Sequence, residues 1–295
     1  MEFEREFSSE KKCIDYIMKL RYPDGKYTCS ICGSKKSWPV RERTYECAEC
    51  HRQESILSGT VFQDTHKPLM LWFRAIWYIT SQKNGASALG LQRVLGIGGY
   101  KTAWTWLHKL RRAMVRPGRD RLSGQIEVDE AYIGAPGTGG KRGRGAENKV
   151  MVGVAVEITD KTVGRIRIGI LEDASQSSLC GFIKDSIEPG STIITDGWRG
   201  YSGLESIGYT HEIIEHQSGE TLLPHVHIVI SLMKRWIMGT LQGSCSPEHL
   251  PYYCDEYTFR FNRRKSKSRG MLFYRLLENA VQLEPVTYRN IIAKQ

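Results

Sequence analysis

The sequence of 295 residues lacks any run of about 18 apolar residues, the length that a membrane-spanning helix would need. Its first residues, MEFEREFSSEKK, are acidic and amphipathic and do not have the pattern of a signal peptide. It also lacks a Gly-x-x-x-x-Gly-Lys-Ser/Thr motif, which excludes the phosphate-binding loop of P-loop nucleotide hydrolases. We therefore expect a cytosolic protein with no membrane partner.

Acidic residues are fewer than basic ones, with 32 Asp and Glu against 42 Lys and Arg, which leaves a formal net charge of +10. A basic excess of this size favours a polyanionic partner, although charge alone leaves a merely soluble basic enzyme open. A content of 40% hydrophobic and 25% charged residues is ordinary for globular proteins, and the length suits about two domains.

Half of the eight cysteines form two close pairs, Cys29 with Cys32 and Cys47 with Cys50, separated by 14 residues. Two Cys-x-x-Cys turns at this separation allow four thiolates to surround one zinc ion, which supplies folding energy that so small a unit lacks. Two disulfides are the weaker alternative, because nothing marks the chain as secreted. His51 is a spare ligand that four cysteines do not need. The scattered thiols are expected in the core: Cys13, Cys180, Cys245 and Cys254.

Apolar residues at helical spacing predict three helices after the ribbon, His66–Gln82, Ala86–Leu95 and Tyr100–Val115. A glycine-rich break, Gly96–Gly99, separates the second from the third, and the third is basic. This pattern favours a helix-turn-helix that binds DNA, although other three-helix bundles look alike. The polar residues of the third helix are expected to face solvent, with the basic ones on DNA phosphates: Lys101, Thr105, His108, Lys109, Arg111 and Arg112.

The pattern then changes to strands. Strands are predicted at Ile126–Ile133, Val150–Ile158, Val163–Leu171 and Ser191–Thr195, with a helix, Ser175–Ile187, before the last of them. Three strands, a helix and a fourth strand follow the order of an RNase H-like core with a mixed sheet.

Two aspartates are the candidate catalytic residues of this core. Asp129 lies among apolar residues in the first strand, where a carboxylate must be paired, hydrogen-bonded or metal-bound, and Asp196 ends the fourth strand. Two divalent ions about 4 Å apart, bridged by carboxylates, stabilise both the attacking and the leaving oxygen in phosphodiester chemistry. Ordinary strand-end residues are the alternative. Glu127 and Glu130 are not counted as ligands, because strand alternation is expected to turn both away from Asp129.

Four stretches, GQIEVDEAYIG, TDGWRGY, VHIVISLMKRWIMGT and SPEHLPYYCDEYTFRFNRR, resemble the zinc-ribbon DDE transposases of bacterial insertion sequences. The resemblance is to the insertion sequence 1595 group with an ISXO-two-like catalytic domain, and it covers nearly the whole chain. It implies a DNA transposase of the bacterial cytosol and nucleoid that binds the ends of its element. The enzyme would cleave these ends and join their 3′-hydroxyls to target double-stranded DNA, as at least a dimer, with two magnesium or manganese ions.

The resemblance also supplies the third catalytic ligand. Family members carry Glu, Asn or His at the position of His227, with a lysine seven residues later, here Lys234. Both residues fall in a helix predicted from about Thr221 to Met238, where a separation of nearly two turns places them on one face. Its buried face is predicted to carry Val229, Leu232 and Trp236. An ordinary surface histidine is the alternative, and a nitrogen ligand would suit manganese better than magnesium.

Two basic segments are further candidates for phosphate contact, with solvated surface as the alternative. The first is the loop Gly137–Lys149, which contains Lys141, Arg142 and Arg144. The second contains Arg263, Arg264 and Lys265, at the end of a helix that begins at Ser246-Pro247. The buried face of that helix is predicted to carry Leu250, Tyr253, Tyr257 and Phe261.

These elements predict an α+β chain of four parts. Residues 1–60 would form the N-terminal helix and zinc ribbon, 61–120 the helix-turn-helix region, 121–245 the RNase H-like catalytic domain and 246–295 the C-terminal helices. Two other functions remain open at this stage: a DNA-binding regulator or inactive transposase descendant, and a structure-specific nuclease that needs no particular terminal sequence.

Overall fold

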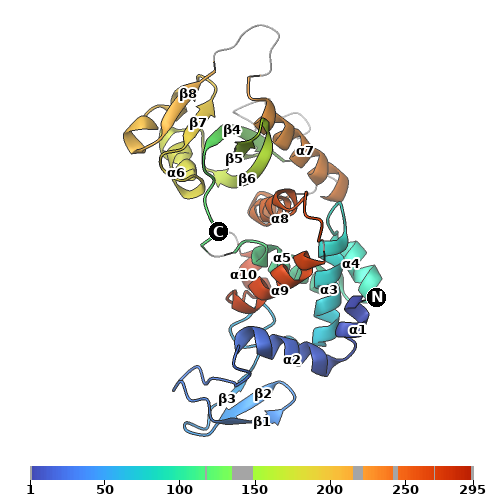
Figure 1. The fold of residues 1–295 in the computed structure, drawn as a ribbon. Coiled ribbons are helices and arrows are strands. Elements are labelled where there is room, and N and C mark those ends of the chain that lie inside the picture. The colour runs from blue at the N-terminus through green and yellow to red at the C-terminus, as the bar shows by residue number, and fades with distance from the viewer. Residues whose placement is uncertain are drawn as a thin grey trace. The chain divides into compact units, whose positions relative to one another are not determined.

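The computed structural model describes residues 2–116, 118–134, 149–214, 222–241, 245–268 and 270–293. Three predicted phosphate contacts, Lys141, Arg142 and Arg144, lie outside these residues. The chain divides into two compact units, Met1–Arg116 with Lys267–Lys294, and Pro117–Ser266 (Figure 1). The segment 246–295, predicted as one domain, is thereby shared between the two units. None of the helices in the described ranges is long and apolar enough to cross a membrane.

The first unit begins with two helices, α1 (Glu2–Glu6) and α2 (Glu10–Arg21), followed by a small antiparallel sheet. The sheet has the order β1-β2-β3, with β1 at Ser37–Arg41, β2 at Thr44–Cys47 and β3 at Gln53–Ser55. Cys47 is the last residue of β2 and pairs with Ser37 of β1. The chain then turns through Cys50 and His51, whose backbone is left-handed with φ 57°. The turn holds the second cysteine pair at one end of the sheet.

The rest of this unit is helical, with α3 (Leu69–Ser81), α4 (Ala88–Leu95), α5 (Tyr100–Ala113), α9 (Met271–Gln282) and α10 (Tyr288–Ile292). The first three are the predicted helices, and α4 and α5 are joined through Gly96, which is left-handed at φ 62°. Such a residue ends a helix without strain because glycine has no side chain. Helix α9 packs against α2, α3 and α5. Helices α3 and α5 meet through Trp72 and Trp106, whose rings stack with centroids 3.8 Å apart.

The second unit is built on a five-stranded sheet. Its strands are β4 (Gln125–Ile133), β5 (Val150–Thr159), β6 (Thr162–Leu171), β7 (Thr192–Thr195) and β8 (Thr210–Ile213). The order is β6-β5-β4-β7-β8, with β4, β5 and β6 antiparallel and β7 and β8 parallel to β4. This is the RNase H-like arrangement, and four of its strands agree with the predicted ones to within a residue or so. Strand β8 was not predicted.

Helices cover both faces of this sheet (Figure 1). Helix α6 (Gln176–Ser186), capped by the Ser175 side chain, packs on the face that carries Ile126 and Val128. Helices α7 (Pro224–Leu241) and α8 (Leu250–Asn262) pack on the other face. The predicted buried residues of α8 are all buried: Leu250, Tyr253, Tyr257 and Phe261.

The predicted buried face of α7 is partly wrong. Val229 is fully buried, but Leu232 is 38% exposed. The residues of α7 that contact the core are Val226, Val229, Ile230, Met233 and Ile237. These residues recur at the expected spacing of three and four, but the buried stripe is shifted by one position from the predicted stripe. Leu232 therefore lies at the edge of the buried stripe.

Candidate zinc centre and active site

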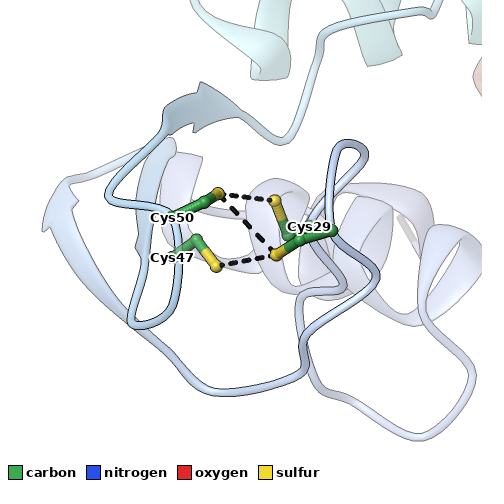
Figure 2. A group of neighbouring side chains, drawn as sticks. Cys29, Cys47 and Cys50 are labelled. Carbon is green, nitrogen blue, oxygen red and sulfur yellow. Dashed lines mark hydrogen bonds between the residues drawn. The ribbon is translucent and has the colours of Figure 1, made fainter.

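The four paired cysteines converge at one end of the ribbon (Figure 2). The sulfur of Cys29 lies 3.6 Å from that of Cys50, and the Cys32 sulfur lies 3.4 Å from Cys47 and 3.7 Å from Cys50. Four thiolates about 2.3 Å from a central zinc ion would be separated by about 3.8 Å at tetrahedral angles. All eight cysteines are free, so the disulfide alternative is wrong. The geometry fits a zinc ion bound by four cysteines.

Backbone N–H groups prepare two of these thiols for metal binding. Those of Cys50 and Glu49 lower the pKa of the Cys47 thiol to about 6. The N–H groups of Cys32 and Ile31 lower the pKa of Cys29 in the same way. Since the thiolate is the form that binds zinc, both tight turns favour the charged state that the ion requires.

In the second unit, Asp129 and Asp196 come from neighbouring parallel strands. The register pairs Glu127 of β4 with Ile194 of β7, and each aspartate lies two residues beyond its member of that pair. Residues two apart on a strand share a face, and Ile194 contacts the core beneath α7 and α8. Asp129 therefore lies on the face that α7 covers, and Asp196 directly follows the last residue of β7, the strand beside β4.

His227, in the first turn of α7, lies beside Asp129. Its Nε2 atom is 3.3 Å from Oδ2 of Asp129. Asp129, His227 and Lys234 line one open cavity of about 440 Å³, together with Lys149 at the edge of the described chain. Asp196 is not part of this lining, and among the described residues the four cysteines are the only group of three or more metal-binding side chains whose ligand atoms all lie within 4.8 Å of one another. The structure thus brings three of the four predicted catalytic residues to one cavity.

The electrostatic state of Asp129 reflects these surroundings. Burial and the negative charges of Glu130 and Asp196, against the opposing effect of His227, together raise the pKa of its carboxyl to about 6. A buried carboxylate among other carboxylates is costly until a cation balances it. The Asp129 carboxylate and the His227 imidazole, 3.3 Å apart at a site with this charge, are ligand types that suit a divalent ion.

The expectation that Glu127 and Glu130 both turn away from Asp129 is wrong for Glu127. Glu130 does point to the other face, where it accepts a hydrogen bond of 2.9 Å from the Tyr201 hydroxyl. Glu127 shares the face of Asp129 because the two are separated by two residues. Its side chain is buried and reaches the first turn of α7. The alternation of the strand, counted correctly, would have found this.

The structure also corrects the predicted outer face of α5. His108 and Arg111 are buried, at 0% and 2% exposed, and the Arg111 guanidinium donates to the carbonyl of Ala86. Their burial follows from the packing of α4, α9 and α10 around α5. This packing leaves a narrower solvent-exposed face on α5 than its sequence pattern predicts. Arg111 is therefore not presented to a phosphate.

The other basic residues of α5 remain accessible to different degrees. Lys101 is exposed, and its ammonium lies 3.9 Å from the centre of the Tyr288 ring. Lys109 and Arg112 are half-buried, and burial lowers the pKa of Lys109. An open cavity of about 350 Å³ is lined by Lys67, Lys101 and Lys109 and by two threonines of α5.

The arginines after α8 have structural partners of their own. Arg264 donates to the carbonyls of Gly164 and Val163, and its guanidinium lies 4.0 Å from the centre of the Phe261 ring. Arg263 donates to the Phe259 carbonyl. Lys265 is exposed. Of the three predicted phosphate contacts here, Lys265 is thus the one with a free approach from solvent.

A zinc ribbon followed by an RNase H-like core defines the class of a nucleic-acid-processing enzyme, and the comparisons narrow it. Residues 121–262 match the family model of the ISXO2-like transposase domain, and residues 8–53 match that of the transposase zinc-ribbon domain. Two separate parts of the chain thus match the models of zinc-ribbon transposases. The resemblance seen in the sequence is confirmed, as is the predicted fold class.

Individual relatives agree with the family models. Over 256 residues the chain is 29% identical to an uncharacterised protein in transposable element ISH50 of Halobacterium salinarum. The matched region covers 78% of this chain and 84% of that protein. Among solved structures, the catalytic core domain of BIV integrase matches 49% of this chain and 86% of its own, at 12% identity and a TM-score of 0.32. A chain of the Drosophila P element transposase strand transfer complex matches 74% of this chain and 65% of its own, at 9% identity and a TM-score of 0.28. These two scores are too low to carry an argument.

Proposed function

We propose that this transposase is a metal-dependent enzyme that cleaves the ends of an insertion sequence and joins the exposed 3′-hydroxyls to target DNA. One observation carries the proposal. Asp129 lies on β4 of an ISXO2-like transposase domain with His227 3.3 Å away, and Asp196 directly follows β7, the parallel strand beside β4. Strand transfer exchanges one phosphodiester bond for another, so the reaction needs no nucleotide hydrolysis.

In this proposal Asp129 and Asp196 hold two magnesium or manganese ions with their carboxylates, and His227 contributes a nitrogen ligand. When bound, such ions stabilise the charge on the attacking and leaving oxygens of the phosphodiester. Lys234 lines the same cavity as His227, where its ammonium would contact a phosphate of the DNA backbone. Tyr201 holds Glu130 on the opposite face, so that this carboxylate stays out of the ligand set.

The first unit would hold the DNA ends. The accessible basic residues of α5, Lys101, Lys109 and Arg112, would contact phosphates, and two of them line the cavity beside Lys67. Lys265 would act in the same way at the end of α8. The zinc ribbon presents Trp38 and Val40, exposed by 44% and 36%, beside Arg41, a combination suited to DNA or to a partner subunit. Two element ends must be joined in one event, so the active species is at least a dimer on DNA.

The test uses purified protein and a plasmid that carries the ends of its element, with magnesium or manganese. Asp129→Asn and Asp196→Asn each remove a proposed ligand, and we expect cleavage and joining to fall by more than about 100-fold. Asp160→Asn is the matched control, because Asp160 lies in the β5–β6 turn in a left-handed conformation that asparagine also tolerates.

Three outcomes would contradict the proposal. Activity that survives either ligand substitution would place the site elsewhere. Equal cleavage of plasmids without the ends would indicate a structure-specific nuclease. Binding of the ends without cleavage, with either metal, would indicate a DNA-binding regulator.

A further inference from the structure

A buried glutamate two residues before Asp129 connects the catalytic strand to the helix that carries His227. Glu127 is 3% exposed, and both of its carboxylate oxygens are occupied. One lies 2.6 Å from Nδ1 of His225, and the other accepts a hydrogen bond of 2.8 Å from the backbone N–H of Val226. The other ring nitrogen of His225 lies 3.3 Å from the carbonyl oxygen of Lys161. The imidazole is therefore fixed at both of its nitrogens.

These contacts fall where α7 needs an external partner. The helix begins at Pro224, and the backbone N–H groups in the first turn of a helix have no carbonyl partner within the helix. The Glu127 carboxylate on β4 supplies the missing acceptor, and its negative charge suits the positive end of the helix dipole. The amide that it holds belongs to Val226, the residue immediately before His227. A movement at this amide is transmitted directly to His227.

We propose that Glu127 is a positioning residue, which holds the first turn of α7 against β4 and thereby sets the separation of His227 from Asp129. This inference rests on the proposed function of Asp129 and His227 as metal ligands. Strand β4 carries Glu127 and Asp129 on one face, and the first turn of α7 carries His225 and His227. Two carboxylate–histidine contacts, of 2.6 Å and 3.3 Å, therefore join the same two elements. The Glu127–His225 contact is partly buried, and the Asp129–His227 contact opens into the cavity.

The prediction is that loss of Glu127 acts through the metal site. For Glu127→Ala we expect kcat for strand transfer to fall, and the affinity for manganese alone to weaken, by about 10- to 100-fold, as when groups that orient metal ligands are removed. The KM for DNA ends should stay within about 2-fold, because the substitution leaves the basic surfaces unchanged. Glu127→Gln still offers an acceptor to Val226 and should recover part of both losses. His225→Ala should cause a smaller loss of both quantities.

Rates and manganese affinities are measured per folded, zinc-loaded molecule, with urea unfolding of every variant. Glu157→Ala is the matched control, because Glu157 is also a largely buried, ion-paired carboxylate of this sheet but bonds to Arg165 instead of α7. It should lose stability and keep its manganese affinity. In the His227→Ala background, Glu127→Ala should add less than about 3-fold to the loss of kcat, because residues that act through one another are not additive.

The inference is overturned if Glu127→Ala keeps wild-type kcat and manganese affinity per folded molecule, or if its effect multiplies fully with that of His227→Ala. If Glu127→Ala does not fold, the same two criteria apply to Glu127→Gln and His225→Ala. Asp129→Asn in the same assay separates this failure from a failure of the proposed function. An active Asp129→Asn overturns both. An inactive Asp129→Asn beside a fully active Glu127→Ala overturns the positioning role alone.

Discussion

The ring of Phe182 lies directly against the backbone of Gly153. A Cβ atom added to Gly153 would lie 2.8 Å from one ring carbon, and one added to Gly169 would lie 2.8 Å from the opposite edge of the ring. The two glycines are register partners on β5 and β6. The Phe182 ring of α6 thus packs against two neighbouring strands at a point where neither has a side chain. This lets the helix lie close to the sheet.

We predict that Gly153→Ala destabilises the second unit by about 1–3 kcal/mol, because the sheet and α6 must separate to admit the methyl group. Urea unfolding of the full chain, followed by circular dichroism, measures this change.

Gly181→Ala is its matched control, since Gly181 is an exposed residue of α6 with no atom near its added Cβ. It should gain about 0.5–1 kcal/mol from its better helix propensity. Equal stability of the two variants would mean that the close contact at Phe182 does not exist in solution.

A second prediction concerns the zinc centre. Cys47→Ser removes one ligand of a small unit that depends on its ion for folding, so we expect loss of bound zinc and rapid proteolysis within residues 22–60. Metal analysis and limited proteolysis measure both effects. Cys180→Ser, which changes a half-buried thiol of α6, should keep full zinc. Wild-type protein without zinc, or Cys47→Ser with a full complement, would refute the centre.

Local sequence pattern predicted most of the second unit. Strands β4, β5 and β6 are long and apolar, and Ser175 marks the start of α6, so each element is specified by its own residues. Strand β8 was missed because THEI has four residues and little apolar character, and its pairing with β7 is its main support. The burial of Arg111 was missed for a related reason. Arg111 bonds to the carbonyl of Ala86, and α5 packs against α4 and against α9, which follows more than 150 residues later; the periodicity of α5 reveals none of these contacts.

In the candidate site, too, local sequence pattern predicted some features, while others depend on tertiary packing. Asp129 in the first strand and Asp196 after the fourth were found from the predicted strands, and the pairing of β4 with β7 brings these two strands side by side. The 3.3 Å approach of His227 depends on how α7 docks, and the resemblance pointed to this residue where spacing could not. The roles of these three residues stay predictions until they are tested.

A third prediction concerns the choice of metal. His227→Glu replaces a neutral nitrogen ligand by a carboxylate beside Asp129, and hard oxygen ligands suit magnesium better. We expect the ratio of magnesium-supported to manganese-supported strand transfer to rise by about 10-fold. His249→Glu, at a histidine of the 3-10 turn Pro247–His249 before α8, is the control for the change in charge. An unchanged ratio in His227→Glu would remove His227 from the ligand set.

The last prediction uses the pair of Glu157 and Arg165. Burial raises the pKa of Glu157. Two hydrogen bonds from the Arg165 guanidinium, of 2.8 and 3.0 Å, and one from the N–H of Ser123 lower it by more, so the net pKa lies below 4.5. A carboxyl whose pKa is lower in the folded than in the unfolded chain stabilises the fold at every pH above its unfolded pKa. This contribution is lost as the pH falls through the folded pKa.

We therefore expect Glu157→Gln to cost about 1 kcal/mol at pH 7, a modest figure because the Arg165 side chain is 41% exposed. The difference from wild type should shrink as the pH drops below 4.5, where Glu157 of the unfolded chain is already protonated. Urea unfolding at a series of pH values measures it. Glu172→Gln, at an exposed position after β6, should change the free energy of unfolding by less than about 0.5 kcal/mol throughout. A cost for Glu157→Gln that persists undiminished in acid would show that this pair does not stabilise the fold through its charge.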